Sequence, residues 1–316
     1  MSLKATPQKI SNLVQRYIDK YQSDQNHRDE YIYQLTPSEC GEFADFLRSD
    51  SGRAFICFYP LSEQQYDKES NEFMTATFYP PKYMALKDNK IKLGLNVVIP
   101  TRNRYVDRAQ VVEIIAHELN HAYTTWNEIK NKHISHPIGI IASVADIFKS
   151  KKQKYTYSER LQKYDNIIPT NNGSLRDDFR WVGYFGVQTE INANLAGIDA
   201  FLYEQGGDIS KLPHSRGYQT FKIVHKKFKN LTKNATETDW QWAQKNATYI
   251  GLRQNENLSQ FKNRYIKYYE HIFNEFEAKI NKITAKYTNK KDKFKSARIT
   301  ILSKNNKRTF NKQKVK

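Results

Sequence analysis

Residues 114 to 123 read IIAHELNHAY, and this stretch constrains the fold more than any other part of the chain. His117 and His121 are four residues apart, so both imidazoles project from one face if the stretch is an α-helix. The flanking residues in the stretch are uncharged, as expected of a helix buried beneath a cleft. We therefore predict a buried helix from about residue 108 to about residue 130, begun by a cap at Asp107.

His117, Glu118 and His121 form the arrangement H-E-x-x-H. In this arrangement the two histidines bind zinc, and the glutamate is the general base toward a zinc-activated water. The alternative is a solvated helix that carries two histidines by chance, but such a helix would carry charges close to them. We predict that His117 and His121 bind Zn²⁺ and that Glu118 is a catalytic base.

A catalytic zinc site has three protein ligands and leaves the fourth position to water. We predict Glu190 as the third ligand, because it is a lone acid among apolar and amide neighbours, where a buried carboxylate is costly unless it is paired or binds a metal. Asn194 lies one turn later and is expected to orient a ligand histidine. An interaction of Glu190 with its own helix dipole is a second interpretation. Three residues after the motif helix are alternative ligands: His133, His136 and Asp146.

HELNH at 117 to 121, together with the string E-x-x-A-N-x-x-A that begins at Glu190, resembles the zincin metallopeptidases, specifically the glutamate-liganded gluzincins. The second string is similar to a motif of the ImmA/IrrE peptidase family, which is found with phage and mobile elements. The resemblance covers about residues 90 to 206, and the 68 residues between the last motif histidine and Glu190 exceed the interval of compact members. It implies zinc-dependent hydrolysis of a polypeptide, with the strand KLGLNVVI (92 to 99) as the sheet edge that binds substrate backbone.

Peptide hydrolysis passes through a tetrahedral oxyanion, which needs a hydrogen-bond donor besides zinc. The residues that follow the second predicted helix offer four candidates: His214, Tyr203, Arg216 and Tyr218. We favour His214, although the sequence does not choose among them.

The order of elements predicts a mostly helical α+β protein with a small mixed β-sheet before the motif helix. Stretches rich in β-branched and aromatic residues predict its strands at 53 to 59, 72 to 79 and 92 to 99. The polar stretch 150 to 180 predicts a surface loop. A second apolar helix is expected from near Val182 to the Gly206-Gly207 pair.

We divide the chain into four parts: an N-terminal helical segment (1 to 50), a zincin-like metallopeptidase domain (51 to 215), a C-terminal helical segment (216 to 285) and a basic tail (286 to 316). The first part contains a helix that begins after Thr6-Pro7 and carries an apolar stripe. The third contains a long amphipathic helix that begins near Leu258 and leads into the tail.

The formal net charge is +18, and residues 286 to 316 carry twelve Lys and Arg against one acid. This tail predicts an anionic partner, either nucleic acid or an acidic protein, and a solubilising extension is the alternative interpretation. The long helix and the tail also favour a different function. The chain would then be a structural or assembly protein, encoded by a phage or another mobile element, that retains a zincin domain with little or no proteolytic role.

Cys40 and Cys57 are too few for a disulfide framework. The N-terminus has no apolar signal region, and no apolar run approaches the roughly 18 residues needed to cross a bilayer. We therefore expect a cytoplasmic protein without a membrane span, with a phage virion as the alternative location.

Overall fold

The computed structural model describes residues 6–23, 31–34, 36, 54–61, 75–79, 94–102, 106–132, 173–246 and 256–312. Most of these residues are helical, which confirms the predicted helical class. The α-helices are α1 (Pro7–Ser23), α3 (Arg108–Lys132), α6 (Leu175–Phe185), α7 (Gln188–Glu204), α8 (Arg216–Asn234), α9 (Glu237–Asn246) and α10 (Leu258–Lys312), and the 3₁₀-helix η3 spans Ile209–His214.

Four short strands form one sheet: β1 (Tyr31–Gln34), β2 (Ala54–Leu61), β3 (Thr75–Tyr79) and β4 (Gly94–Arg102). Their order across the sheet is β1-β2-β4-β3. The central pair, β2 and β4, is parallel, with Ala54 opposite Leu95, whereas β1 and β3 run antiparallel to their neighbours. β2, β3 and β4 overlap the three stretches that the sequence predicts as strands.

The edge strand of this sheet differs from the one that the resemblance implies. β4 covers most of KLGLNVVI and directly precedes the motif helix, but it pairs with β2 on one side and with β3 on the other. Its backbone groups are therefore used within the sheet. Among the described strands, β3 lies outermost on this side, so Thr75–Tyr79 replaces residues 92 to 99 as the edge.

The N-terminal helix α1 is part of the same body as the sheet. It begins as predicted, since the carbonyl of Thr6 accepts hydrogen bonds from the amides of Lys9 and Ile10. Its apolar stripe is buried and contacts α3 and α7. β1, also from the first 50 residues, is a strand of the sheet. The described elements of the first 50 residues, α1 and β1, therefore pack with the motif helix and the sheet.

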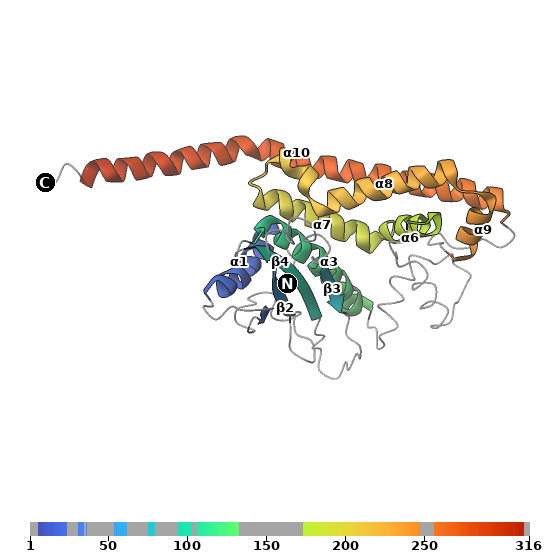
Figure 1. The fold of residues 1–316 in the computed structure, drawn as a ribbon. Coiled ribbons are helices and arrows are strands. Elements are labelled where there is room, and N and C mark those ends of the chain that lie inside the picture. The colour runs from blue at the N-terminus through green and yellow to red at the C-terminus, as the bar shows by residue number, and fades with distance from the viewer. Residues whose placement is uncertain are drawn as a thin grey trace.

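The motif helix α3 forms where the sequence predicts it. Asp107 Oδ1 accepts a hydrogen bond of 3.2 Å from the amide of Gln110, which caps the start of the helix. α3 lies between the sheet and the remaining helices, and α7 packs along it (Figure 1). Both helices that carry predicted metal ligands are thus in direct contact.

The predicted second helix is in fact two helices. α6 begins at Leu175, inside the stretch expected to be a loop, with Ser174 Oγ accepting a hydrogen bond from the amide of Asp177. α6 ends at Phe185 with Gly186 as its C-cap, and α7 begins at Gln188 instead of near Val182. The close approach of α10 requires glycine at this junction, because a Cβ at Gly186 would lie 2.4 Å from Cε1 of Tyr269. The end is as predicted, since Gly206 and Gly207 have positive φ angles of 65° and 80°.

α6, α8, α9 and α10 pack into a helical layer against α7 (Figure 1). Its core is aromatic, and the fully buried members include Trp240, Phe179, Tyr265, Phe221 and Phe273. These residues come from both sides of residue 215, so the boundary expected there falls inside one packed unit. α10 begins at Leu258 as predicted and continues to Lys312.

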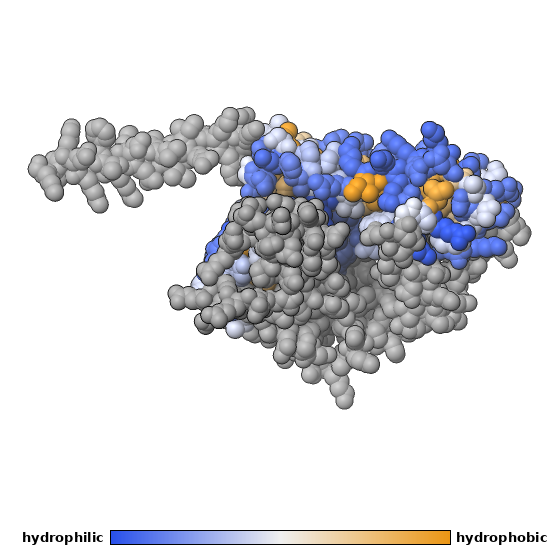
Figure 2. Space-filling model, in the orientation of Figure 1, coloured by the Kyte–Doolittle hydropathy of each residue, from blue (hydrophilic) through white to orange (hydrophobic). Residues whose placement is uncertain are grey.

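The surface over α8 and α10 is mainly hydrophilic, with small apolar spots (Figure 2). Ile209 and Ile223 are large apolar side chains that stay exposed. Within the part of the chain that the structure describes, every helix is too short or too polar to cross a membrane.

Candidate metal centre

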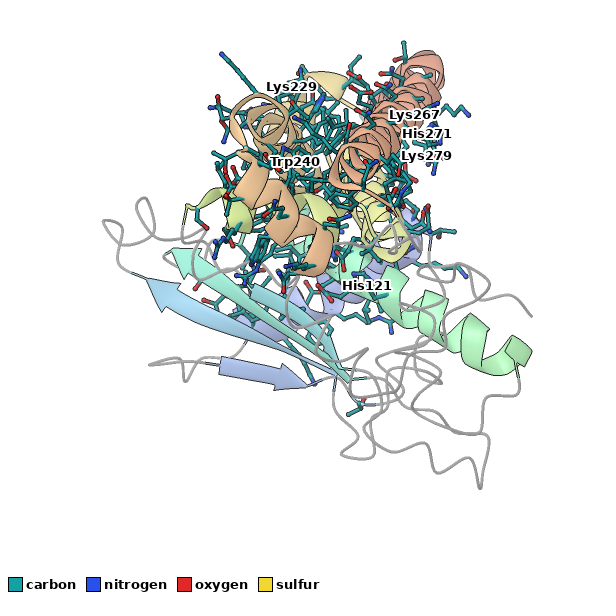
Figure 3. The ribbon with its side chains drawn as sticks, turned by 90° about the vertical axis from the view of Figure 1, so that its right-hand side faces the viewer. His121, Lys229, Trp240, Lys267, His271 and Lys279 are labelled. Atoms are coloured by element: carbon teal, nitrogen blue, oxygen red, sulfur yellow. The ribbon has the colours of Figure 1, made fainter. Side chains whose placement is uncertain are left out.

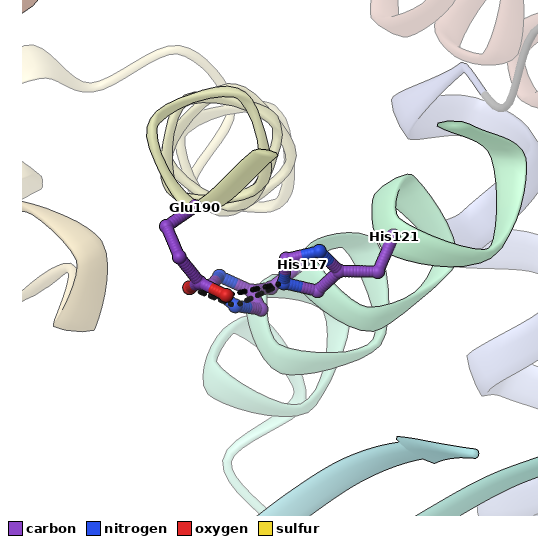
Figure 4. Close-up of side chains that lie close together, drawn as sticks. All are labelled: His117, His121 and Glu190. Atoms are coloured by element: carbon purple, nitrogen blue, oxygen red, sulfur yellow. Dashed lines mark hydrogen bonds and ion pairs between the residues drawn. The ribbon is translucent and has the colours of Figure 1, made fainter. Parts of the chain in front are cut away.

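Three side chains from two helices converge at the contact between α3 and α7 (Figure 4). His117 Nε2 and His121 Nε2 lie 3.1 Å apart. Glu190 faces them from the first turn of α7, with Oε2 3.5 Å from His117 Nε2 and Oε1 3.2 Å from His121 Nε2. The cluster lies where α3 meets the helical layer, as the position of His121 in Figure 3 shows. The chain therefore brings together the three predicted ligands.

The spacing of these atoms fits a tetrahedral zinc ion. Zinc binds imidazole nitrogen and carboxylate oxygen at about 2.0–2.2 Å, so tetrahedral ligand atoms lie about 3.3–3.5 Å from one another. The two imidazole nitrogens lie 3.1 Å apart, and each faces a different oxygen of Glu190, at 3.5 Å from His117 and 3.2 Å from His121. With one ligand atom from each residue, the three atoms lie within 4.8 Å of one another. Two neutral imidazoles and one carboxylate are also a donor set that zinc prefers. The residues present thus fit the predicted metal.

The electrostatics of the cluster favour an ionised carboxylate. Burial alone would raise the pKa of Glu190, but the hydrogen bonds and charges of His117 and His121 outweigh it and hold the pKa well below its usual range. Burial would likewise lower the pKa of His121, yet the hydrogen bond and charge of Glu190 raise it. The carboxylate is therefore available as a ligand at neutral pH.

Glu118 lies between the two ligand histidines in sequence and is 8% exposed. It lines a pocket of about 230 Å³ together with His117 and Glu190. The far wall of this pocket comes from the helical layer: Trp181, Tyr184 and Phe185 of α6, and Arg216 and Thr220 of α8. A molecule in the pocket would therefore be next to two of the three candidate ligands, His117 and Glu190, and to the predicted base and aromatic side chains.

The other predicted site residues have different positions. Asn194 lines the pocket, but its Nδ2 donates a 2.9 Å hydrogen bond to the carbonyl of Glu190 on its own helix. His214 is exposed at the end of η3, and the pocket wall does not include it. Tyr203 donates its hydroxyl hydrogen bond to Gln8. Of the four residues considered as oxyanion donors, Arg216 is the one that lines the pocket. The alternative ligands His133, His136 and Asp146 lie outside the described residues.

Sequence reasoning missed Glu113, which is 3% exposed and one turn before His117 on α3. Its carboxylate accepts hydrogen bonds from Ser215 Oγ at 2.6 Å, from the amide of Arg216 at 3.0 Å and from the amide of Gly217 at 2.8 Å. A signal was present in the sequence, because Glu113 is a lone acid in an apolar run, as Glu190 is.

Three comparisons with known proteins find no relative: no family model matches the chain, no curated protein matches it, and no solved structure matches it.

Proposed function

We propose that the chain is a zinc-dependent peptidase whose sheet, α3 and α7 form a zincin-like domain. The observation that carries this proposal is the convergence of His117, His121 and Glu190 from two helices, with one ligand atom from each within 4.8 Å of the others, beside the buried carboxylate of Glu118. A purely structural zinc site has closed coordination and no need of such a base. Glu118 therefore favours catalysis over a structural role for the metal.

The residues divide the chemistry among them. His117, His121 and Glu190 hold the metal, which when bound supplies a Lewis acid and activates water. Glu118 takes a proton from the attacking water, whose oxygen bonds to the scissile carbonyl carbon while the carbonyl electron pair moves to the oxygen. The carbon–nitrogen bond then breaks, and Glu118 returns the proton to the leaving amine. The products are one carboxylate and one amine.

Substrate backbone is expected along β3. Outermost strands present unpaired backbone groups, to which an extended peptide adds by main-chain hydrogen bonds. β3 is an outermost strand among those described, and it contacts α3, the helix that carries His117 and His121. Binding through main-chain hydrogen bonds depends little on the amino-acid sequence of the peptide.

The proposal is tested by counting zinc per chain, by elemental analysis, on protein purified without chelator. We expect close to one zinc for the wild type, clear loss for Glu190→Ala, and no loss for Glu270→Ala, which changes an exposed glutamate on α10. If the folded wild type takes up no zinc even when zinc is supplied, the three residues do not form a zinc site.

The catalytic step is tested separately with Glu118→Gln and fluorescein-labelled casein. We expect this variant to bind zinc as the wild type does but to lose hydrolysis by a factor of at least about 100, the lower range for a general base. Full hydrolysis by Glu118→Gln would show the mechanism to be wrong.

A second candidate function is a structural role in an assembly, which the length of α10 favours, because this helix extends beyond the rest of the body (Figure 1). Recovery of the chain within a large particle, together with inactivity of the free zinc-loaded chain, would support it.

A further inference from the structure

We propose that Arg216 stabilises the oxyanion of peptide hydrolysis and that Glu113 is the positioning residue that holds Arg216 at the site. This inference rests on the proposed peptidase function and adds two residues to its machinery. It replaces the expectation that His214 is the oxyanion donor.

Arg216 is the first residue of α8 and lines the same pocket as His117, Glu118 and Glu190. Burial lowers the pKa of its guanidinium, while the charges of Glu113 and Glu118 raise it. The guanidinium thus lies within electrostatic reach of the proposed base, although Arg216 as a whole is exposed to solvent. It stays charged at neutral pH and offers up to five donors in a fixed plane. Charged donors that face the reacting carbonyl stabilise the negative charge that develops on its oxygen.

Glu113 fixes the start of the helix that carries Arg216. One carboxylate oxygen accepts from Ser215 Oγ and from the amide of Gly217, and the other accepts from the amide of Arg216. The first amides of an α-helix have no partner within the helix, so this carboxylate satisfies two of them. Ser215 Oγ in turn accepts a hydrogen bond from the amide of Tyr218. A single buried side chain of α3 therefore sets the position of the first turn of α8.

Close packing around Glu113 leaves little room for the junction to move. A Cβ at Gly197 of α7 would lie 3.2 Å from Glu113 Cγ. A Cβ at Gly217 of α8 would lie 3.0 Å from the carbonyl oxygen of Asn194 on α7. α3, α7 and α8 therefore meet at this point, one helical turn from His117. α3 thus carries His117 and His121 and, through Glu113, also holds Arg216 in place.

The experiment compares the wild type with Arg216→Ala, Arg216→Lys and Glu113→Gln. Asp178→Asn is the matched control. Asp178 is also a buried acid, 7% exposed, and it accepts hydrogen bonds from Lys227 and Asn230 of α8. Both partners lie far along α8 from Arg216. The first readout is zinc per chain. The second is the affinity of the zinc-loaded protein for acetohydroxamate, an anionic oxygen donor to zinc, by calorimetry. The third is hydrolysis of fluorescein-labelled casein.

We expect all variants to keep their zinc. Arg216→Ala should weaken acetohydroxamate binding about 10- to 100-fold, the range of a lost charge-assisted hydrogen bond, and lower kcat by about 100-fold with little change in KM. Arg216→Lys should recover part of both losses. Glu113→Gln should act in the same direction, because its amide nitrogen faces backbone donors and cannot accept from them. Asp178→Asn should match the wild type.

Acetohydroxamate affinity and kcat that are unchanged in Arg216→Ala would overturn the inference while leaving the zinc peptidase intact. A rise in KM alone would also overturn it, because Arg216 would then bind substrate and not the oxyanion. If the wild type holds no zinc, the proposed function fails first and the inference falls with it. A Glu113→Gln variant that does not fold leaves the Arg216 variants decisive, because their side chain lies at the pocket wall.

Discussion

Glu190 and the two histidines support one another through their charges before any metal is considered. The carboxylate accepts from both imidazoles, and this keeps its pKa low despite burial. The helix period brings His117 and His121 onto one face, so their pairing follows from the sequence alone. Glu190 also follows from sequence, because a lone acid in an apolar helix needs a compensating partner.

His214 and Arg216 illustrate what local sequence cannot decide. They are two residues apart and both are exposed, yet Arg216 at the start of α8 lines the pocket and His214 at the end of η3 does not. The difference depends on Glu113, about 100 residues earlier in the chain, which accepts a hydrogen bond from the amide of Arg216. No local pattern indicates so distant a contact.

His214→Ala is expected to leave casein hydrolysis within about twofold of the wild type, because exposed side chains away from special contacts contribute little. The measurement is kcat/KM for wild type and variant in parallel, with Glu118→Gln as the inactive reference. A loss of hydrolysis approaching that of Glu118→Gln would return the oxyanion role to His214.

At the scale of elements, the crossing of α3 and α7 decides whether the site exists, since each helix supplies part of the ligand set. Gly197 lies at this crossing, where a Cβ would be 3.2 Å from both Cγ and the carbonyl oxygen of Glu113. A glycine inside a helix normally lowers helix stability by about 1 kcal/mol relative to alanine. Its presence here is explained by the close approach of the two helices.

We predict that Gly197→Ala weakens zinc binding by about tenfold, within the range for changes around metal ligands. The added methyl should push α7 away from α3 and move Glu190 relative to the histidines. Zinc affinity is measured by competition with a chromogenic chelator. The control is Ala278→Gly on the exposed face of α10, which changes helix propensity without changing this crossing. Unchanged affinity in Gly197→Ala would mean that the crossing absorbs a methyl group.

At the scale of the molecule, the sequence predicts elements better than their arrangement. The start of α1 at Pro7, the start of α3 at Arg108 and the start of α10 at Leu258 follow from caps and periodicity. The helix end at Gly186 does not, and the contact of Gly186 with Tyr269 on α10, 83 residues later, is equally hidden from local sequence. The central position of β4 likewise depends on pairing with β2 and β3, which strand patterns do not encode.

α10 has two parts with different surroundings. Up to Tyr287 it is tied to α7, because the Tyr287 hydroxyl donates to the Asp199 carbonyl at 2.8 Å and Lys286 pairs with the Asp199 carboxylate at 2.8 Å. Beyond this point the helix runs away from the body (Figure 1). Residues 290 to 316 carry eleven Lys and Arg against one acid. This part of the chain therefore combines high positive charge with a position outside the folded core.

Truncation after Asn289 should remove most affinity for a polyanion and leave the zinc site unchanged, because the contacts of Tyr287 and Lys286 are kept. The measurement is fluorescence anisotropy of labelled single-stranded DNA at several salt concentrations, with zinc per chain as the control. Phosphate contacts release counterions, so full-length affinity should fall steeply as salt rises, with a shallower slope after truncation. Equal affinity and slope for both chains would assign any polyanion binding to the body, where α8 carries exposed lysines on its outer face.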